Sequence, residues 1–252
     1  MSQYMKRSFY IIVAIPFVLF ASNSMAQSYV PEWKNEKIKV QEKVVIYAYA
    51  FNLKDVRLLE SPFKRAMSAD TAYLLMLDPD RLLADFLVHA GLEPKAERYG
   101  GWESSGLAGH TLGHYLSALS LHYASSGDTR FKERVNYIVD ELKRSQVARK
   151  TGYIGAIPNE DSMWAEVAKG NIRSRGFDLN GAWSPWYTVH KIMAGLVDAY
   201  LYCDSRKALE INTGIADWAN ELTSRLPDSL MQNMLITEYG GMKDVLVNTY
   251  PL

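Results

Sequence analysis

The sequence predicts an all-α fold assembled from repeated helical hairpins. Residues 109–128 align with residues 185–204 without a gap, at one constant offset that places His114 on His190 and Asp128 on Asp204. From Ser61 onward apolar residues recur at helical spacing, whereas only residues 44–53 alternate enough to form a strand or an extended arm. A repeated unit of helix, short turn and helix is typical of hairpin arrays rather than of mixed α/β folds.

Helical periodicity and local start and stop signals give the expected elements in order. Ser61 is expected to cap the first helix, with Pro62 at its first position, and Gly91 ends the second helix. The chain is expected to turn at residues 78–80 and to form a loop at 100–103. Helices are expected over residues 63–77, 82–90, 107–123, 129–147, 188–202, 205–226 and 228–234, with a further start near Met242.

Residues 151–186 separate the two matching segments and form the least periodic part of the chain. Long loops inside compact domains are commonly functional, and the aromatic residues here, which include Tyr153 and Trp183, argue against disorder. We expect a structured rim over one mouth of the hairpin array, a natural place for substrate contacts.

The N-terminus has the pattern of an export signal. Lys6 and Arg7 precede an apolar stretch over residues 9–21, and the small residues Ser24 and Ala26 flank Met25. We expect a signal peptide over 1–26, a polar lead or arm over 27–50, and an exported protein in the periplasm or outside the cell. The apolar stretch is short for a membrane span, although an uncleaved anchor remains the alternative reading.

Charge and cysteine content narrow the function classes. Twenty-eight basic residues balance twenty-eight acidic ones without a long run of like charge, so the pattern of a nucleic-acid binder is absent. A neutral substrate fits better. The single cysteine, Cys203, cannot form an intramolecular disulfide, so packing alone must stabilise the exported chain.

Three histidines are candidate site residues. His110 and His114 are four residues apart and share one helical face, and Gly109 and Gly113 beside them allow a neighbouring backbone to approach closely. The pair could instead ligate a metal, for which no third ligand can be placed, or be hydrogen-bonded core histidines. His190 follows aromatic residues, as expected where a sugar is both stacked and hydrogen-bonded.

The other candidates give weaker signals. Glu238 precedes a Gly-Gly turn that could expose its carboxylate, although such a residue is more often solvated surface. His89 and His122 lack comparable neighbours and are interpreted as structural.

Five strings of the sequence resemble, in order, motifs of the β-L-arabinofuranosidase family of bacterial glycoside hydrolases (family 127). The likeness extends from about Phe51 to the last residues. The strings are residues 101–103, 109–118, 152–158, 183–192 and 238–242.

The resemblance implies an α/α toroid, a six-hairpin glycosidase-like barrel that is expected to be incomplete here, with residues 51–252 as the N-terminal portion of the catalytic domain. It implies a pocket for the terminal arabinofuranose of plant-derived glycans, and hence a carbohydrate as partner. The side chains that it implies at or near the pocket are His110, His114, His190, Trp102, Glu103, Trp186 and Glu238.

The sequence also departs from the family pattern. Tyr239 stands where histidine is usual, and Lys243-Asp244 replaces Asn-Glu. The resemblance implies a zinc-bound cysteine nucleophile, with cysteine and glutamate ligands, and a glutamate acid/base; these are expected downstream of Leu252. We therefore expect no metal or cofactor in this chain, and its own catalytic residues are unknown.

Three functions stay open at this point. The first is a truncated hydrolase of this family, the second a non-catalytic carbohydrate-binding remnant, and the third another toroid enzyme such as a polysaccharide lyase, for which Arg173 and Arg175 are the nearby cations. An incomplete ring is also expected to be marginally stable or prone to aggregation through an exposed apolar stripe. The stripe comprises Leu196, Val197, Ala199, Tyr200 and Leu201.

Overall fold

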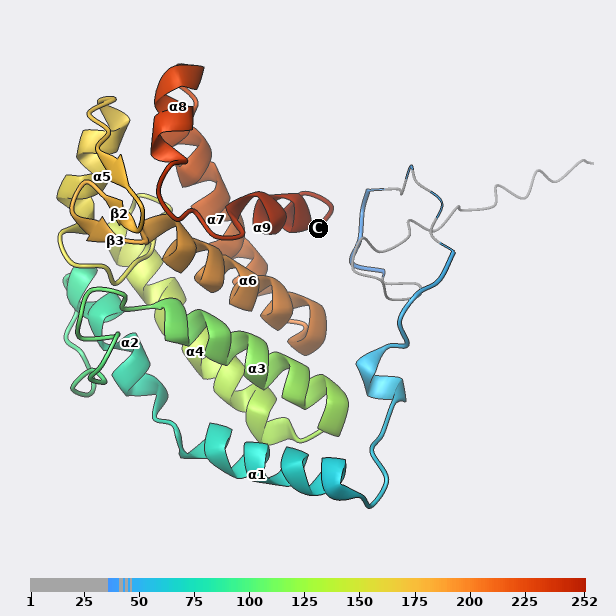
Figure 1. The fold of residues 1–252 in the computed structure, drawn as a ribbon. Coiled ribbons are helices and arrows are strands. Elements are labelled where there is room, and N and C mark those ends of the chain that lie inside the picture. Colours follow the sequence, from blue (N-terminus) through green and yellow to red (C-terminus); the bar gives the residue numbers. More distant parts are fainter. Residues whose placement is uncertain (1–35, 41–42, 44, 46) are drawn as a thin grey trace, which may run out of the picture.

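A computed structural model describes residues 36–40, 43, 45 and 47–252. Almost all of the regular secondary structure in these residues is helical (Figure 1). The expected signal peptide lies outside the described residues, as does most of the expected arm. A short 3₁₀ helix, η1 (Leu53–Asp55), precedes the α-helices. These are α1 (Pro62–Met76), α2 (Pro79–His89), α3 (His110–Ser126), α4 (Thr129–Arg149), α5 (Glu160–Ala168), α6 (Pro185–Cys203), α7 (Arg206–Thr223), α8 (Asp228–Met234) and α9 (Met242–Thr249).

The two matching segments form equivalent helical hairpins, α3–α4 and α6–α7. Helices α3 and α6 lie side by side with their first turns at the same end of the molecule (Figure 1), and α4 and α7 pack against them and against each other. The pairing is parallel, because Gly113 meets Lys191 near the start of the helices and Ser120 meets Cys203 near their ends. The all-α hairpin architecture expected from the sequence is confirmed.

Glycine makes the contact between α3 and α6 unusually close. A Cβ atom on Gly113 would lie 2.2 Å from the carbonyl oxygen of Lys191, and one on Gly195 would lie 2.6 Å from the carbonyl oxygen of Gly113. Any side chain at these positions would force the backbones apart. The expected close backbone approach at Gly113 is therefore confirmed, and this contact sets the distance between the two helix starts that carry the candidate site.

The two hairpins differ at their turns. The C-cap residues of α3 and α6 are Gly127 and Asp204, each in the left-handed conformation, with φ of 76° and 61°. Asp128 then caps α4 through its side chain, whereas Ser205 caps α7. The second turn is thus one residue later than the gapless alignment predicts, and Asp128 and Asp204 are not equivalent caps.

The first helix begins as the sequence predicts, and the second does not. The Ser61 hydroxyl accepts a hydrogen bond from the Lys64 amide at 3.2 Å, with Pro62 as the first helical residue of α1. Helix α2 starts earlier than expected, at Pro79, because the Asp78 carboxylate accepts a hydrogen bond from the Asp80 amide and caps it.

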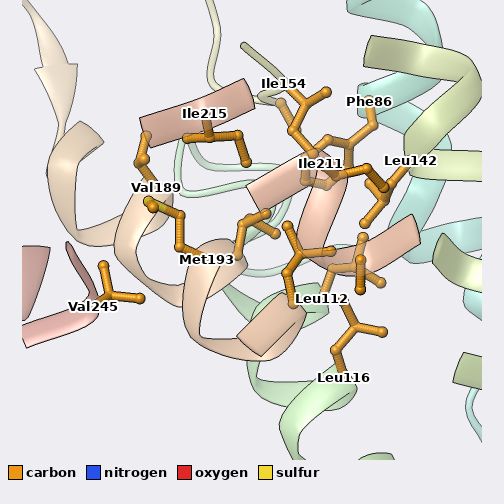
Figure 2. Packing of buried hydrophobic residues seen from close by; sticks show 14 of the residues in the cluster. Phe86, Leu112, Leu116, Leu142, Ile154, Val189, Met193, Ile211, Ile215 and Val245 are labelled. Atoms are coloured by element: carbon orange, nitrogen blue, oxygen red, sulfur yellow. The ribbon is translucent and has the colours of Figure 1, made fainter. Parts of the chain in front are cut away.

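A continuous hydrophobic core joins the hairpins (Figure 2). Phe86 of α2, Leu112 and Leu116 of α3, and Leu142 of α4 are fully buried, and Met193 of α6 packs beside them. The core continues through α7 to α9, where Val245 is 2% exposed. Burial of this apolar surface provides the main stabilisation of the helical array.

The segment between the hairpins contains more regular structure than expected. Residues 151–186 include helix α5 and a three-stranded antiparallel sheet of β1 (Ser174–Arg175), β2 (Asp178–Leu179) and β3 (Ala182–Trp183). Ser174 pairs with Leu179, and Asp178 pairs with Trp183. These elements are too short for a periodic pattern to reveal them.

The prediction of an exposed apolar stripe on α6 is wrong. Leu196 and Ala199 are fully buried and Tyr200 is 9% exposed, because these residues lie on the part of α6 enclosed by its neighbouring helices. The half-buried face of α6 instead carries residues such as His190, Ala194 and Asp198. The stripe Leu196, Val197, Ala199, Tyr200 and Leu201 therefore supplies no reason for aggregation.

The described part of the arm packs against the far end of α6. Lys37 Nζ donates to the carbonyl oxygens of Tyr200 and Leu201, and it lies 2.6 Å from the carboxylate of Asp204. Within the described residues, no helix combines the length and the apolar character needed to cross a membrane.

Candidate functional site

A pocket of about 320 Å³ opens at the end of the molecule where α3 and α6 begin. Its walls come from α6, from the loop before α3, from the segment that carries the small sheet, and from the loop between α8 and α9. The lining residues include Trp102, Phe177, Trp183, Tyr187, His190, Lys191 and Glu238. Residues 151–186, which were expected to form a rim over one mouth of the array, thus contribute walls to this pocket.

His190 is held by the backbone of the loop that precedes α9. The Gly241 amide donates a hydrogen bond to His190 Nδ1 at 3.1 Å. Because Nδ1 accepts, the proton of the neutral ring must be on Nε2. Burial, with a further contribution from Lys191, lowers the pKa of His190 to about 4. The imidazole is therefore neutral near pH 7, with one N–H donor, and His190 is a lining residue of the pocket.

Glycine at position 241 makes this contact possible. A Cβ atom on Gly241 would lie 2.6 Å from both Cε1 and Nε2 of His190, although the backbone itself, with φ of −89°, could accept any residue. The Gly-Gly turn after Glu238 thus fits directly against the imidazole ring. The function of this glycine is steric rather than conformational.

Glu238 is half-buried and braces the same loop. One carboxylate oxygen, Oε1, accepts a hydrogen bond from the Gly240 amide at 2.5 Å, and the Glu238 amide donates to the carbonyl oxygen of Gly176 at 2.7 Å. The loop before α9 is consequently tied to the segment of the small sheet. The proximity of Glu238, after the larger effect of burial, raises the pKa of Tyr187.

His110 and Glu103 form a buried pair beside this pocket. His110 Nδ1 donates to the carbonyl oxygen of Leu107 at 2.7 Å and also lies 3.2 Å from Glu103 Oε1, and Glu103 Oε2 accepts from the Gly109 amide at 3.0 Å. The proton on Nδ1 is directed at Leu107, so the contact with Glu103 is chiefly electrostatic.

Glu103 and His110 each stabilise the charged form of the other. Burial would raise the pKa of Glu103, but interactions with His110, Thr111 and the Gly109 amide outweigh burial and lower it. Burial would likewise lower the pKa of His110, but Glu103 and the Leu107 carbonyl raise it. Glu103 is thus ionised, and His110 holds a proton more firmly than a free imidazole does.

His114 lies between the two other histidines and is exposed. Its Nε2 is 3.3 Å from the Tyr187 hydroxyl, and its ring is edge-on to that of His110 at 6.1 Å. Burial of the ring and the nearby charge of Lys191 lower its pKa. The shared face expected for His110 and His114 is confirmed, but one ring is buried and the other is exposed.

Trp102 is a lining residue of the pocket with an indole that is 63% exposed. Its ring lies 5.9 Å from that of His110 and 6.2 Å from that of Trp183. A large aromatic surface that is held between neighbours but left open suits contact with a ligand.

Trp186 is the one candidate that the structure does not bring into this group. Its indole is 4% exposed and packs against Trp164, at 4.7 Å, and against Trp218 on the other side of α6. The aromatic wall beside His190 is formed instead by Tyr187 and Trp183. Successive residues on a helix point about 100° apart, which separates Trp186 from Tyr187.

Sequence reasoning also missed Lys191 as part of the pocket. Its ammonium group lies 5.1 Å from the centre of the Tyr187 ring, and its charge affects all three histidines. Tyr187, by contrast, was expected near His190 because it lies three residues before it in the sequence. No comparable signal identifies Lys191.

The residues present do not fit the zinc site that the family resemblance implies. Cys203 is 1% exposed at the end of α6 remote from the pocket, and burial raises the pKa of its thiol. Across the part of the chain that the structure describes, no group of three or more histidine, cysteine or acidic side chains could hold a metal ion.

The fold is that of an all-α glycosidase of the helical-toroid type. The model of the β-L-arabinofuranosidase GH127 catalytic domain matches residues 55–252, and the chain belongs to this family of glycoside hydrolases. No curated protein matches the sequence.

Proposed function

We propose that the protein acts as a β-L-arabinofuranosidase-type glycoside hydrolase that binds the non-reducing-end L-arabinofuranose of plant-derived glycans in the pocket beside His190. We further propose that it does so after export, in the periplasm or outside the cell. The observation that carries the proposal is the neutral imidazole of His190 in the lining of an aromatic-walled pocket. Sugars are recognised by this combination of aromatic surface and few, well-placed polar groups.

The chemistry of the pocket supports a neutral, polyhydroxylated ligand. His190 offers a donor that stays uncharged near pH 7, Lys191 offers further donors, and Trp102 offers an open ring face. Family membership supplies the reaction class, which is hydrolysis of a glycosidic bond.

A second candidate function is carbohydrate binding without turnover by these residues. The two carboxylates at the site, Glu103 and Glu238, each accept a hydrogen bond from a nearby backbone amide, at 3.0 Å and 2.5 Å. Carboxylates with these partners hold the walls of the site. Neither is assigned as nucleophile or acid/base, the two groups that glycoside hydrolysis requires.

The test separates binding from turnover. Titration calorimetry with methyl β-L-arabinofuranoside measures binding, and release of L-arabinose from the same compound measures hydrolysis. We expect binding by the wild-type protein and a loss of about tenfold in the His190→Ala variant, since one donor to a sugar is removed. Release of arabinose supports the hydrolase, and binding without release supports the second candidate. Absence of binding and release would exclude both.

His122→Ala provides the matched control. This histidine is bonded to Thr71 at 2.7 Å and packs on Phe131, and it lines neither the pocket nor its rim. Its replacement affects the same residue type on the neighbouring helix. We expect unchanged sugar affinity in this variant, with any effect confined to stability.

A further inference from the structure

The small sheet of β1, β2 and β3 carries two aromatic residues of the pocket beside His190. Phe177 lies in the turn between β1 and β2, and Trp183 is the last residue of β3; both line the pocket. Leu179 of β2 is fully buried and anchors the middle strand, but each strand has only two residues. A sheet this short is marginally stable unless other contacts hold it. The position of the aromatic wall therefore depends on what fixes the sheet to its surroundings.

Asn180 lies in the turn between β2 and β3 and bonds that turn to neighbouring segments. With Gly181 it forms a two-residue hairpin turn in which both residues have positive φ, 53° and 87°, a conformation that asparagine and glycine tolerate best. Its side-chain Oδ1 accepts a hydrogen bond from the Arg173 amide at 2.7 Å. Its Nδ2 donates to the carbonyl oxygen of Asn171 at 2.7 Å and to Glu166 Oε2 at 2.9 Å. The amide group of Asn180 thus uses both donor hydrogens and its oxygen.

The bond to Glu166 fastens the hairpin to helix α5, which lies beside the sheet (Figure 1). Glu166 Oε2 also accepts from the Arg173 guanidinium at 2.6 Å, so one carboxylate holds both the turn and the segment that enters β1. Helix α5 is itself fixed in the core. Its first residue, Glu160, is 2% exposed, and Glu160 Oε2 accepts from the Tyr153 hydroxyl at 2.9 Å. Asn180 therefore connects the sheet to a rigid support.

The opposite end of the sheet meets the segments that carry the rest of the pocket. The carbonyl oxygen of Phe177 accepts from the Ser184 amide at 2.7 Å, and that of Gly176 accepts from the Glu238 amide at 2.7 Å. Without the Asn180 side chain, the sheet would stay attached at this end and lose its bonds to α5 at the other. Trp183 lies close to the released end, three residues after Asn180, and its position would then be less well fixed.

We infer that Asn180 is a positioning residue for sugar binding, because its bonds from the β2–β3 turn to α5 hold Trp183 and Phe177 in place as a wall of the pocket. The inference rests on the proposed function, in which this wall contacts the sugar. Asn180 is not among the described residues that line the pocket, so it acts through the wall. A wall that is already in place costs less to order when the ligand binds. Replacement of Asn180 should therefore weaken binding without removing a direct contact.

The test compares Asn180→Gly with the wild-type protein by two measurements. Glycine keeps the turn, because it tolerates a positive φ, and removes every side-chain bond. In titration calorimetry with methyl β-L-arabinofuranoside, we expect the affinity to fall about fivefold. In protein labelled with 5-fluorotryptophan, fluorine NMR without sugar should show the Trp183 resonance shifted or broadened. That resonance is identified by its loss in Trp183→Phe. A role in stability alone would not produce both changes in a variant that unfolds at the wild-type temperature.

Three further variants provide the controls. Asn159→Gly is the matched control, because Asn159 also has a positive φ, 58°, and precedes the same helix without a side-chain capping bond; it should leave affinity and the Trp183 resonance unchanged. Glu166→Gln keeps an oxygen acceptor for Asn180 Nδ2 and should behave like the wild type. Glu166→Ala removes the acceptor and should reproduce the effect of Asn180→Gly. Should Asn180→Gly not fold, Glu166→Ala, a change at a side chain that is 38% exposed, gives the same comparison.

The outcomes distinguish this inference from the proposed function. An unchanged Trp183 resonance in Asn180→Gly, or a changed resonance with unchanged affinity, overturns the positioning role. If the methyl glycoside still binds in a manner sensitive to His190→Ala, the proposed function stands in either case. Failure of the wild-type protein to bind the methyl glycoside overturns both.

Discussion

Helices α3 and α6 each carry a candidate histidine within their first two turns, yet the two imidazoles have opposite properties. His110 of α3 lies beside the Glu103 carboxylate, which helps raise its pKa. His190 of α6 accepts a hydrogen bond from the Gly241 amide, and burial lowers its pKa to about 4. The first ring holds its proton more firmly than a free imidazole does, and the second is neutral near pH 7.

The difference shows that a repeat can supply equivalent positions without equivalent chemistry. In the gapless alignment His114 corresponds to His190, and His110 corresponds to Trp186. The surroundings come from segments outside the repeat, namely the loop before α3 and the loop before α9. These loops, rather than the helices, decide which ring is buried, charged or available to a ligand.

The largest expected effect comes from the contact that joins the two helices. Gly113→Ala should lower the free energy of unfolding by about 3 kcal/mol, because its Cβ would lie 2.2 Å from the Lys191 carbonyl oxygen, and this outweighs the gain of about 1 kcal/mol in helix propensity. Chemical denaturation measures the loss. Gly100→Ala, where no atom lies within 4 Å, should be nearly neutral. Equal stability of the two variants would contradict the close contact.

Gly241→Ala should affect His190 of α6 and leave His110 of α3 unchanged. The new methyl group would displace the His190 ring without backbone strain, and we expect sugar affinity to fall about tenfold. Proton NMR should show the His190 resonance shifted while that of His110 is retained. Unchanged affinity would mean that the position of His190 does not govern binding.

Glu103→Gln should lower the pKa of His110 of α3 and leave His190 of α6 unchanged. With the pKa of His110 raised, its protonation stabilises the fold below the usual value of 6.5, and this contribution is lost as pH rises through the raised pKa. Glu103 has a lowered pKa, so its contribution is present above the usual 4.5 and is lost as pH falls through the lowered value.

The pair of Glu103 and His110 should therefore contribute most to the free energy of unfolding between about pH 4.5 and 6.5. NMR titration of His110 and denaturation across this range measure the effect. Glu103→Gln should reduce that gain and leave the pKa of His190 near 4. A His110 pKa that does not change on substitution would contradict the electrostatic pairing.

The smallest effect is expected from Tyr187→Phe. This change removes the hydroxyl that lies 3.3 Å from His114 Nε2 and keeps the aromatic wall beside His190. Since His114 is exposed, water can replace the lost partner, and sugar affinity should change by less than about threefold. Tyr187→Ala, which also removes the ring, should have the larger effect.

Sequence periodicity predicted the helices well because apolar spacing and caps are local properties. Ser61 and Pro62 start α1 as expected, and α8 has the expected bounds, Asp228–Met234. Helix α5 and the small sheet were missed, since elements of two to nine residues between glycines carry no periodic signal.

For the site, the sequence identified six side chains, Trp102 among them, that the structure gathers at one end of the molecule, and it misplaced Trp186. It also placed the apolar residues of α6 on the wrong face, because periodicity shows that a helix has a buried face but not which neighbours cover it. The place of Lys191 in the pocket depends on helices and loops that are distant in sequence, and no local pattern reveals it.

By itself, the sequence determined the all-α class, the repeated hairpin and the histidines at the helix starts, because spacing and turn chemistry act over a few residues. The family assignment likewise rests on motifs that are visible in the chain. Only the tertiary structure decided that His110 meets Glu103, that Gly241 meets His190, and that Trp102 and His190 line one pocket. Protonation and ligand access depend on neighbours brought together by folding, since burial and nearby charges set the pKa of each group.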